Sequence, residues 1–103
     1  MLKTQHNAWI HAAATIGVGI AGFISGLSSI EWSLIVAAAM AVWIAEALNT
    51  AFEFLADVTS PQFHPLVKKA KDVAAGAVLI AAGGAVLIGL LVFIPHIMSA
   101  FVG

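Results

Sequence analysis

Four polar side chains follow one another along an otherwise apolar stretch of the chain: Glu46, Asn49, Glu53 and Asp57. At about 100° per residue these positions fall within roughly an 80° arc, so we expect them on one face of a helix. The residues that lead into them, 32–45, are almost wholly apolar and predict a membrane-embedded helix. Carboxylates in such a segment cost a few kcal/mol each by insertion scales, so they indicate a functional site.

The chemistry available to these groups differs with depth. Glu46 lies deepest among apolar neighbours, and a carboxyl group placed there suits a general acid or base. Glu53 and Asp57 lie where water and ions reach, and their oxygens suit Mg²⁺. Lys71 can present a cation to phosphate oxygens. The alternative is that the charges neutralise one another, for example Glu53 with Lys71, and only fix the register of the helices.

Composition requires these residues to be held by membrane helices. The chain has 103 residues, of which 62% are hydrophobic and 9% charged, more apolar surface than a soluble domain of this size can bury. Its net charge of −1 gives no indication of nucleic-acid binding, and the lack of cysteine excludes disulfides and thiolate metal sites. Residues 9–27, 32–55 and 73–97 are each long enough to span a bilayer. We therefore predict one all-α integral membrane domain, residues 1–103, with three transmembrane helices.

The distribution of charged residues predicts the orientation of this domain in the membrane. All lysines lie at one end of the three spans, in the N-terminal segment and around the second link, whereas the first link carries Glu31. The first link is expected to be tight, at residues 28–31, and the second longer, at residues 58–70. By the positive-inside rule the N-terminus and the second link are cytoplasmic and the C-terminus is extracytoplasmic. The alternative for the first apolar run is a signal sequence.

Small residues predict close helix packing and assembly. Gly22 and Gly26 form a small-xxx-small pair, and the third span carries a run of alanine and glycine at residues 81–85. Three helices alone cannot enclose Glu46, so we expect it to face a cavity or another subunit.

The histidines give weaker indications than the carboxylates. No two histidines have the spacing of a helical metal site. His64 in the second link would either contact a nucleotide or be solvated. His96 follows Pro95 at the opposite end of the spans from the four polar residues and is expected to be structural.

Three segments of the chain resemble the prokaryotic diacylglycerol kinase family, which includes the undecaprenol kinases. They are EALNTAFEFLAD at residues 46–57, the pair His64–Pro65, and AKDVAAGAVL at residues 70–79; NAWIH at residues 7–11 is similar to the start of the family's first span. The resemblance implies a homotrimeric lipid kinase of the bacterial inner membrane with active sites at subunit interfaces. It would use ATP and Mg²⁺ to phosphorylate diacylglycerol to phosphatidic acid or, alternatively, undecaprenol to undecaprenyl phosphate.

Carried over by position, the resemblance also implies a role for each site residue. Glu46 would be the catalytic base and Glu53 a metal ligand, with Gln5 standing where the family commonly has a second metal-binding glutamate. Cofactor-binding positions would be Asn49, Glu53, Asp57, Gln62, Phe63, His64, Lys71 and Asp72. Lipid-contacting positions would be Asn7, Trp9, His11, Trp32, Glu46 and Ala75. The amphipathic surface helix that usually precedes the family's first span is expected to be missing here.

Two other classes compete with a lipid kinase. A small oligomeric transporter would use Glu46 to couple the movement of protons or cations. It should have polar access from both sides of the membrane, and residues 33–44 offer none from one side. A catalytically inactive relative is the third possibility, and Gln5 favours it because an amide brings one fewer negative charge to the metal.

Overall fold

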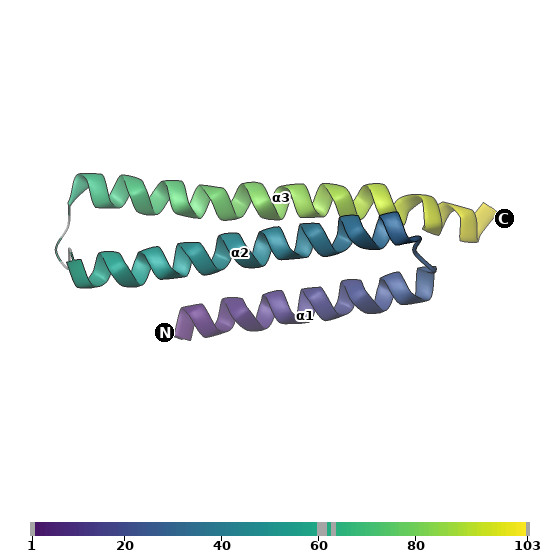
Figure 1. Cartoon of the computed structure of the whole chain (residues 1–103), viewed down its shortest axis with the longest axis horizontal. Helices are drawn as coiled ribbons and strands as arrows, with labels where there is room; N and C mark the ends of the chain where they lie inside the picture. Colours follow the sequence, from purple (N-terminus) through teal and green to yellow (C-terminus); the bar gives the residue numbers. More distant parts are fainter. Residues whose placement is uncertain (1, 60–61, 63, 103) are drawn as a thin grey trace.

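Three helices make up the part of the chain that the computed structural model describes, which is residues 2–59, 62 and 64–102, with side chains from residue 8 onward (Figure 1). They are α1 (Leu2–Ser25), α2 (Ser29–Thr59) and α3 (Pro65–Val102). At 1.5 Å per residue they measure about 36, 46 and 57 Å, against about 30 Å for a hydrocarbon core. All three are long and apolar enough to cross a membrane. The prediction of an all-helical, multi-pass membrane protein is confirmed.

Both links between helices are shorter than predicted. α2 already begins at Ser29, so the first link is residues 26–28 rather than 28–31. α2 continues to Thr59 and α3 begins at Pro65, so the predicted second link, residues 58–70, was wrong in extent and shrinks to residues 60–64. Proline is favoured at the first position of a helix because the N–H there has no acceptor within the helix.

The turn between α1 and α2, which we call the turn end, is built from two capping arrangements. Gly26 ends α1 in a left-handed conformation with φ of 70°, and its N–H donates to the Gly22 carbonyl at 3.0 Å. Ser28 and Glu31 then form a reciprocal capping box at the start of α2. The Glu31 N–H donates to Ser28 Oγ at 3.2 Å, and the Ser28 N–H donates to Glu31 Oε1 at 2.9 Å.

At the opposite end, which we call the link end, residues 60–64 join α2 to α3. His64 caps α3 in two ways: its Nδ1 accepts a hydrogen bond from the Leu66 N–H at 3.2 Å, and its carbonyl accepts one from the Lys68 N–H at 3.0 Å. At the far end of the same helix, Pro95 lies inside α3 and removes one backbone donor. Figure 1 shows the last turns of α3 leaving the line of the rest of the helix.

α2 and α3 pack as an antiparallel pair along most of their length, whereas α1 contacts both of them more sparsely (Figure 1). Two ion pairs mark the register of α2 against α3. Glu31 meets His96 at the turn end, with His96 Nε2 at 3.0 Å from Glu31 Oε2, and Asp57 meets Lys71 at the link end at 3.6 Å. The structural role expected for His96 is consistent with this contact.

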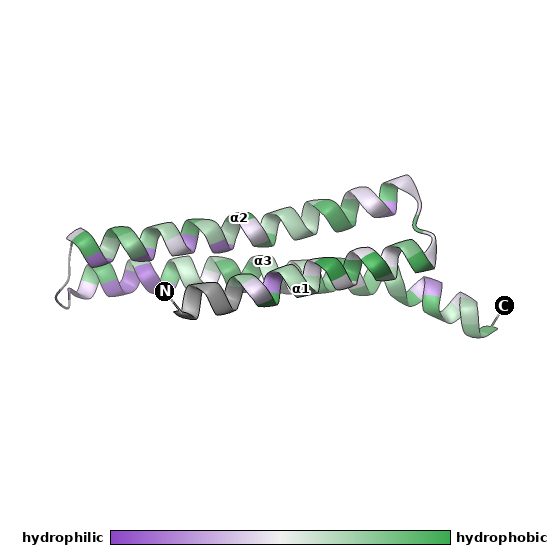
Figure 2. Ribbon diagram, turned by 90° about the horizontal axis from the view of Figure 1, so that it is seen from below, coloured by the Kyte–Doolittle hydropathy of each residue, from purple (hydrophilic) through white to green (hydrophobic). Residues whose placement is uncertain are grey.

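The chain buries very little apolar surface by itself. In the described part, five apolar side chains are buried: Leu27, Ile35, Ala38, Ala56 and Val92. Three of them form a cluster near the turn end, packed against Trp32, Ile88 and Phe93. Large apolar side chains elsewhere are exposed, and Figure 2 shows hydrophobic residues along all three helices. Such a surface needs lipid or further chains to cover it.

Among the glycines expected to pack closely, Gly22 does so within the chain. A Cβ at Gly22 would lie 2.7 Å from Cη2 of Trp32, so the indole ring occupies the space that a side chain would need. Gly26 serves the turn instead. The glycines of α3 have open space around them, which leaves their surface available to other helices or to lipid.

Candidate active site

The predicted polar face of α2 is present. Because α2 is one uninterrupted helix from Ser29 to Thr59, Glu46, Asn49, Glu53 and Asp57 keep the spacing that places them on one face. From Glu46 to Asp57 the face extends about 16 Å along the axis. Figure 2 shows hydrophilic residues gathered on α2 and α3 toward the link end. The helix therefore carries its polar groups from the middle of the membrane span to the link end.

Glu46 contacts a histidine of α1. His11 Nε2 lies 3.4 Å from Glu46 Oε2, and the side chains of His11 and Glu46 are only 22% and 16% exposed. Glu46 also lines a cavity of about 330 Å³ between α1 and α2, together with Ala8, Trp43, Ala47, Thr50, Ala51 and Phe54. One carboxylate oxygen thus faces a histidine, and the group borders an open space.

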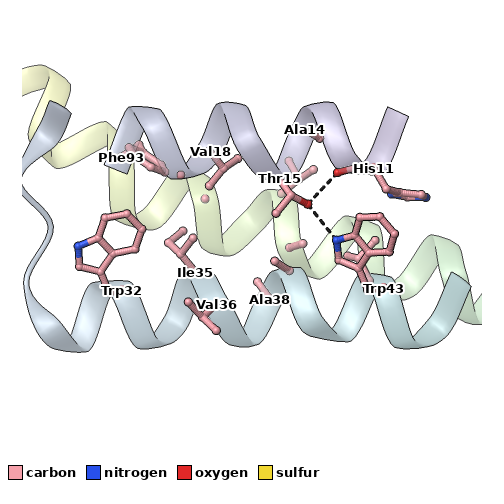
Figure 3. A pocket seen from close by; sticks show the side chains of 16 residues that line it. His11, Ala14, Thr15, Val18, Trp32, Ile35, Val36, Ala38, Trp43 and Phe93 are labelled. Atoms are coloured by element: carbon pink, nitrogen blue, oxygen red, sulfur yellow. Dashed lines mark hydrogen bonds between the residues drawn. The ribbon is translucent and has the colours of Figure 1, made fainter. Parts of the chain in front are cut away.

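A hydrogen bond and a ring contact tie α1 to α2 around this histidine, and a second hydrogen bond lies within α1 (Figure 3). Thr15 Oγ1 donates to the His11 carbonyl at 2.7 Å, and Trp43 Nε1 donates to Thr15 Oγ1 at 2.9 Å. The rings of His11 and Trp43 pack at a centroid distance of 5.8 Å with their planes tilted by 56°. These contacts fix the position of His11 in a region where α1 is otherwise loosely packed.

Asn49, one turn further along α2, holds an unused acceptor. Its Oδ1 is buried and has no hydrogen-bond partner among the described residues. A buried polar atom without a partner costs about 1–3 kcal/mol. Glu53, one turn beyond, is exposed, and no described cation lies within ion-pair distance of it. Asn49 and Glu53 therefore offer oxygen atoms one helical turn apart on this face, and both can bind a ligand.

The ion pairs at the link end differ from the Glu53–Lys71 pair that the sequence analysis considered. Lys71 contacts Asp57 rather than Glu53, with Nζ 3.6 Å from Oδ1. Lys68 pairs with Asp72 one turn apart on α3, at 3.1 Å. All four side chains are well exposed, and such pairs contribute about 0–1 kcal/mol each. They can rearrange around a charged ligand at little cost.

The loop predicted to touch a nucleotide is described only in part. Gln62 is exposed, and Phe63 lies outside the described residues. His64 is exposed and caps α3, so part of its hydrogen-bonding capacity serves the helix.

The predicted lipid positions are spread along the span. Trp9 is 76% exposed near the start of α1, and Ala75 is exposed on α3. Trp32 packs over Gly22 at the turn end. His11 faces Glu46, and the side chain of Asn7 lies outside the described part. A second cavity of about 370 Å³, almost entirely apolar, is lined by all three helices and runs from His11 and Trp43 to Trp32 and Phe93 (Figure 3).

The residues predicted to bind metal have oxygen donors, the kind of ligand that Mg²⁺ prefers. Of the two predicted ligands, Glu53 supplies a carboxylate and the side chain of Gln5 lies outside the described residues. Asn49, one turn from Glu53, adds an amide oxygen to this face. Among the described residues, no group of three or more histidine, aspartate or glutamate side chains is gathered tightly enough to hold a metal. The donor chemistry thus fits Mg²⁺, and the remaining ligands would come from phosphates, water or another chain.

Sequence reasoning missed two features of this arrangement. The Ser28–Glu31 capping box has a local signature, Ser-x-x-Glu, that could have been noticed. The His11–Glu46 contact has no local signature because its partners lie on different helices.

Comparisons with known proteins agree over most of the chain. The family model for prokaryotic diacylglycerol kinase matches residues 1–93. An undecaprenol kinase of Bacillus subtilis is 44% identical over 95 residues, covering 92% of this chain and 77% of the relative. A diacylglycerol kinase of Synechocystis sp. is 40% identical over 100 residues, covering 96% of this chain and 57% of the relative. A diacylglycerol kinase of Escherichia coli is 34% identical over 86 residues, covering 77% of this chain and 70% of the relative. No solved structure matches the chain significantly.

Proposed function

Because this chain belongs to the prokaryotic diacylglycerol kinase family, we propose that it transfers the γ-phosphoryl group of ATP to the hydroxyl group of a membrane lipid. The observation that carries the proposal is the position of Glu46. It is the one carboxylate in residues 32–52, it borders a cavity that opens between apolar helices, and a line of polar side chains leads from it to the link end. A lipid hydroxyl and a water-borne triphosphate can meet along that line.

Glu46 acts as the general base. One of its carboxylate oxygens accepts the proton of the lipid hydroxyl while the hydroxyl oxygen forms a bond to the γ-phosphorus. The bond from that phosphorus to the bridging oxygen of ADP breaks in the same displacement. A positioned base of this kind contributes about 10²- to 10⁴-fold to the rate. Most of the remaining acceleration comes from positioning and charge neutralisation.

The link end holds the nucleotide. Lys71 leaves its weak pair with Asp57 to contact phosphate oxygens. The other proposed nucleotide-binding residues are Gln62, Phe63, His64 and Asp72. Mg²⁺, when bound, neutralises charge on the phosphoryl oxygens. Glu53, the Asn49 Oδ1 atom and Gln5 are the protein groups that would hold it. The unsatisfied buried oxygen of Asn49 supports this assignment.

Diacylglycerol is the proposed acceptor, giving phosphatidic acid. Undecaprenol is a second candidate, favoured by the 44% identity to a Bacillus subtilis protein named undecaprenol kinase. Both are long apolar chains with one hydroxyl group, and both suit a cavity as apolar as the one between His11 and Phe93. The proposed lipid-contacting positions are Asn7, Trp9, His11, Trp32, Glu46 and Ala75.

Assembly and orientation complete the proposal. The exposed apolar surface and the open glycines of α3 support a homotrimer with active sites between subunits. The lysines at the link end support a cytoplasmic N-terminus and link end, with an extracytoplasmic C-terminus, in the bacterial inner membrane. This places the nucleotide site on the side where ATP is available.

The test is a phosphoryl-transfer assay with both acceptors. Purified protein in mixed micelles is given radiolabelled ATP, Mg²⁺ and either diacylglycerol or undecaprenol. We expect label in phosphatidic acid. Label in undecaprenyl phosphate alone would select the second acceptor, and label in neither lipid, from protein that elutes as an assembled oligomer, would reject the proposed function.

A further inference from the structure

His11 and Glu46 are titratable side chains in the middle part of α1 and α2, and they contact each other. Residues 8–25 contain His11 and no other titratable group, residues 32–52 contain Glu46 alone, and residues 73–95 of α3 contain none. His11 Nε2 nevertheless lies 3.4 Å from Glu46 Oε2. Among the side chains that the structure describes, His11 is the titratable group in contact with Glu46.

The contact is held from both helices. Trp43 precedes Glu46 by three residues and so lies on the same face of α2, where its ring packs on His11. Its Nε1–H also donates to Thr15, whose hydroxyl in turn donates to the His11 carbonyl. The Trp43 ring thus packs on the imidazole from the opposite helix, and Thr15 binds the backbone of His11 on its own helix (Figure 3).

We propose that His11 is a positioning residue for the catalytic base, an inference that rests on the proposed function. With substrate bound, its Nε2–H donates to Glu46 Oε2 and leaves Oε1 to receive the proton of the lipid hydroxyl. The 3.4 Å contact is long for a hydrogen bond, and contacts of this kind tighten when substrate binds. A hydrogen bond to a carboxylate is directional, so this donor orients the group that receives the proton. His11 exchanges no proton in the step.

Substitutions at His11 can show whether the residue acts as a hydrogen-bond donor to Glu46 or only by packing against Trp43. His11→Phe keeps an aromatic ring against Trp43 and loses the donor. His11→Gln replaces Nε2 with an amide nitrogen of similar reach, whereas the amide of His11→Asn is too short to reach Glu46. We expect kcat to fall about 10- to 100-fold in the Phe and Asn variants, part of what a general base contributes. The Gln variant should stay within about 3-fold of the parent chain, and KM for ATP should be unchanged in all three.

The control is the same exchange at the other histidine–glutamate contact. His96→Phe removes a donor from Glu31 at the turn end and should leave kcat unchanged. Equal rates for the Gln and Asn variants, or a Phe variant that assembles and works at the parent rate, would overturn the role of His11. If the Phe variant fails to assemble, the comparison of kcat between the Gln and Asn variants still tests whether His11 positions Glu46. Loss of the proposed function itself would appear separately, as an inactive parent chain.

Discussion

The described part of the molecule contains two contacts between a histidine and a glutamate, and the two differ in how much of the carboxylate they use. At the turn end, His96 Nε2 lies 3.1 and 3.0 Å from the two oxygens of Glu31, and Glu31 also accepts the Ser28 N–H. Within the span, His11 contacts one oxygen of Glu46 at 3.4 Å, and no hydrogen bond from another described residue reaches that carboxylate. Both oxygens of Glu31 have partners, which cap the start of α2 and connect it to α3. Glu46 keeps an oxygen available, which is what a catalytic base requires.

The sharpest test of this difference exchanges each glutamate for its amide. Glu46→Gln removes the base, so turnover should fall by about 10²- to 10⁴-fold or more while the oligomer still assembles. Glu31→Gln at the turn end should leave turnover nearly unchanged. Label transfer to lipid measures both rates, and a near-normal rate in the Glu46 variant would contradict its role.

A second test concerns the metal. Glu53→Ala removes a proposed ligand, so the Mg²⁺ concentration needed for half-maximal activity should rise about 10-fold or more. Gln5→Glu should lower it, because a charged oxygen replaces a neutral one. Glu31→Ala, which removes a carboxylate far from the proposed site, is the control. Magnesium titrations that coincide for the parent and the Glu53 variant would count against ligation by Glu53.

A third test asks whether the turn end is a packing region. Gly22→Ala places a Cβ where the Trp32 ring lies, so the protein should lose about 1–3 kcal/mol of stability as the ring is displaced. Gly17→Ala, with open space around it, should cost nothing comparable. Unfolding in a fixed detergent measures both variants, and equal midpoints would show that the contact with Trp32 is dispensable.

The smallest expected effect is at the capping box. Ser28→Ala removes the acceptor of the Glu31 N–H and should cost about 1 kcal/mol, with kcat preserved. Stability and activity are measured on the same preparation. A loss of activity without a loss of stability would place the turn end in the catalytic apparatus and remove the contrast between the two contacts.

Sequence reasoning succeeded where the information is local. The three spans follow from runs of apolar residues, and the polar face of α2 follows from helical periodicity. The family suggested by residues 46–57 and 70–79 is confirmed by the match over residues 1–93. The second link was predicted too long because its prolines were interpreted as loop residues, whereas Pro65 begins α3.

Contacts between helices were beyond the reach of the sequence. Nothing near His11 indicates that it meets Glu46, because the contact depends on how α1 packs against α2. The pair of Lys71 with Glu53, considered as an alternative, is not observed because the register of α3 brings Lys71 to Asp57. The roles assigned to Gln5, Asn7 and Phe63 lie outside what the structure describes. Together with the metal, the nucleotide and the trimer, they stay predictions.

The absence of titratable residues in the half of the span near the turn end has a consequence for energy coupling. Between Glu46 and Glu31 α2 offers no protonatable side chain, and α3 offers none from residue 73 to residue 95. If Glu46 is the proposed base, a proton that it takes up has no titratable side chain of α2 or α3 to pass to across that half. It would then return to the aqueous phase on the side of the link end. The proposed reaction would then carry no proton across the membrane, and the membrane potential should not affect its rate.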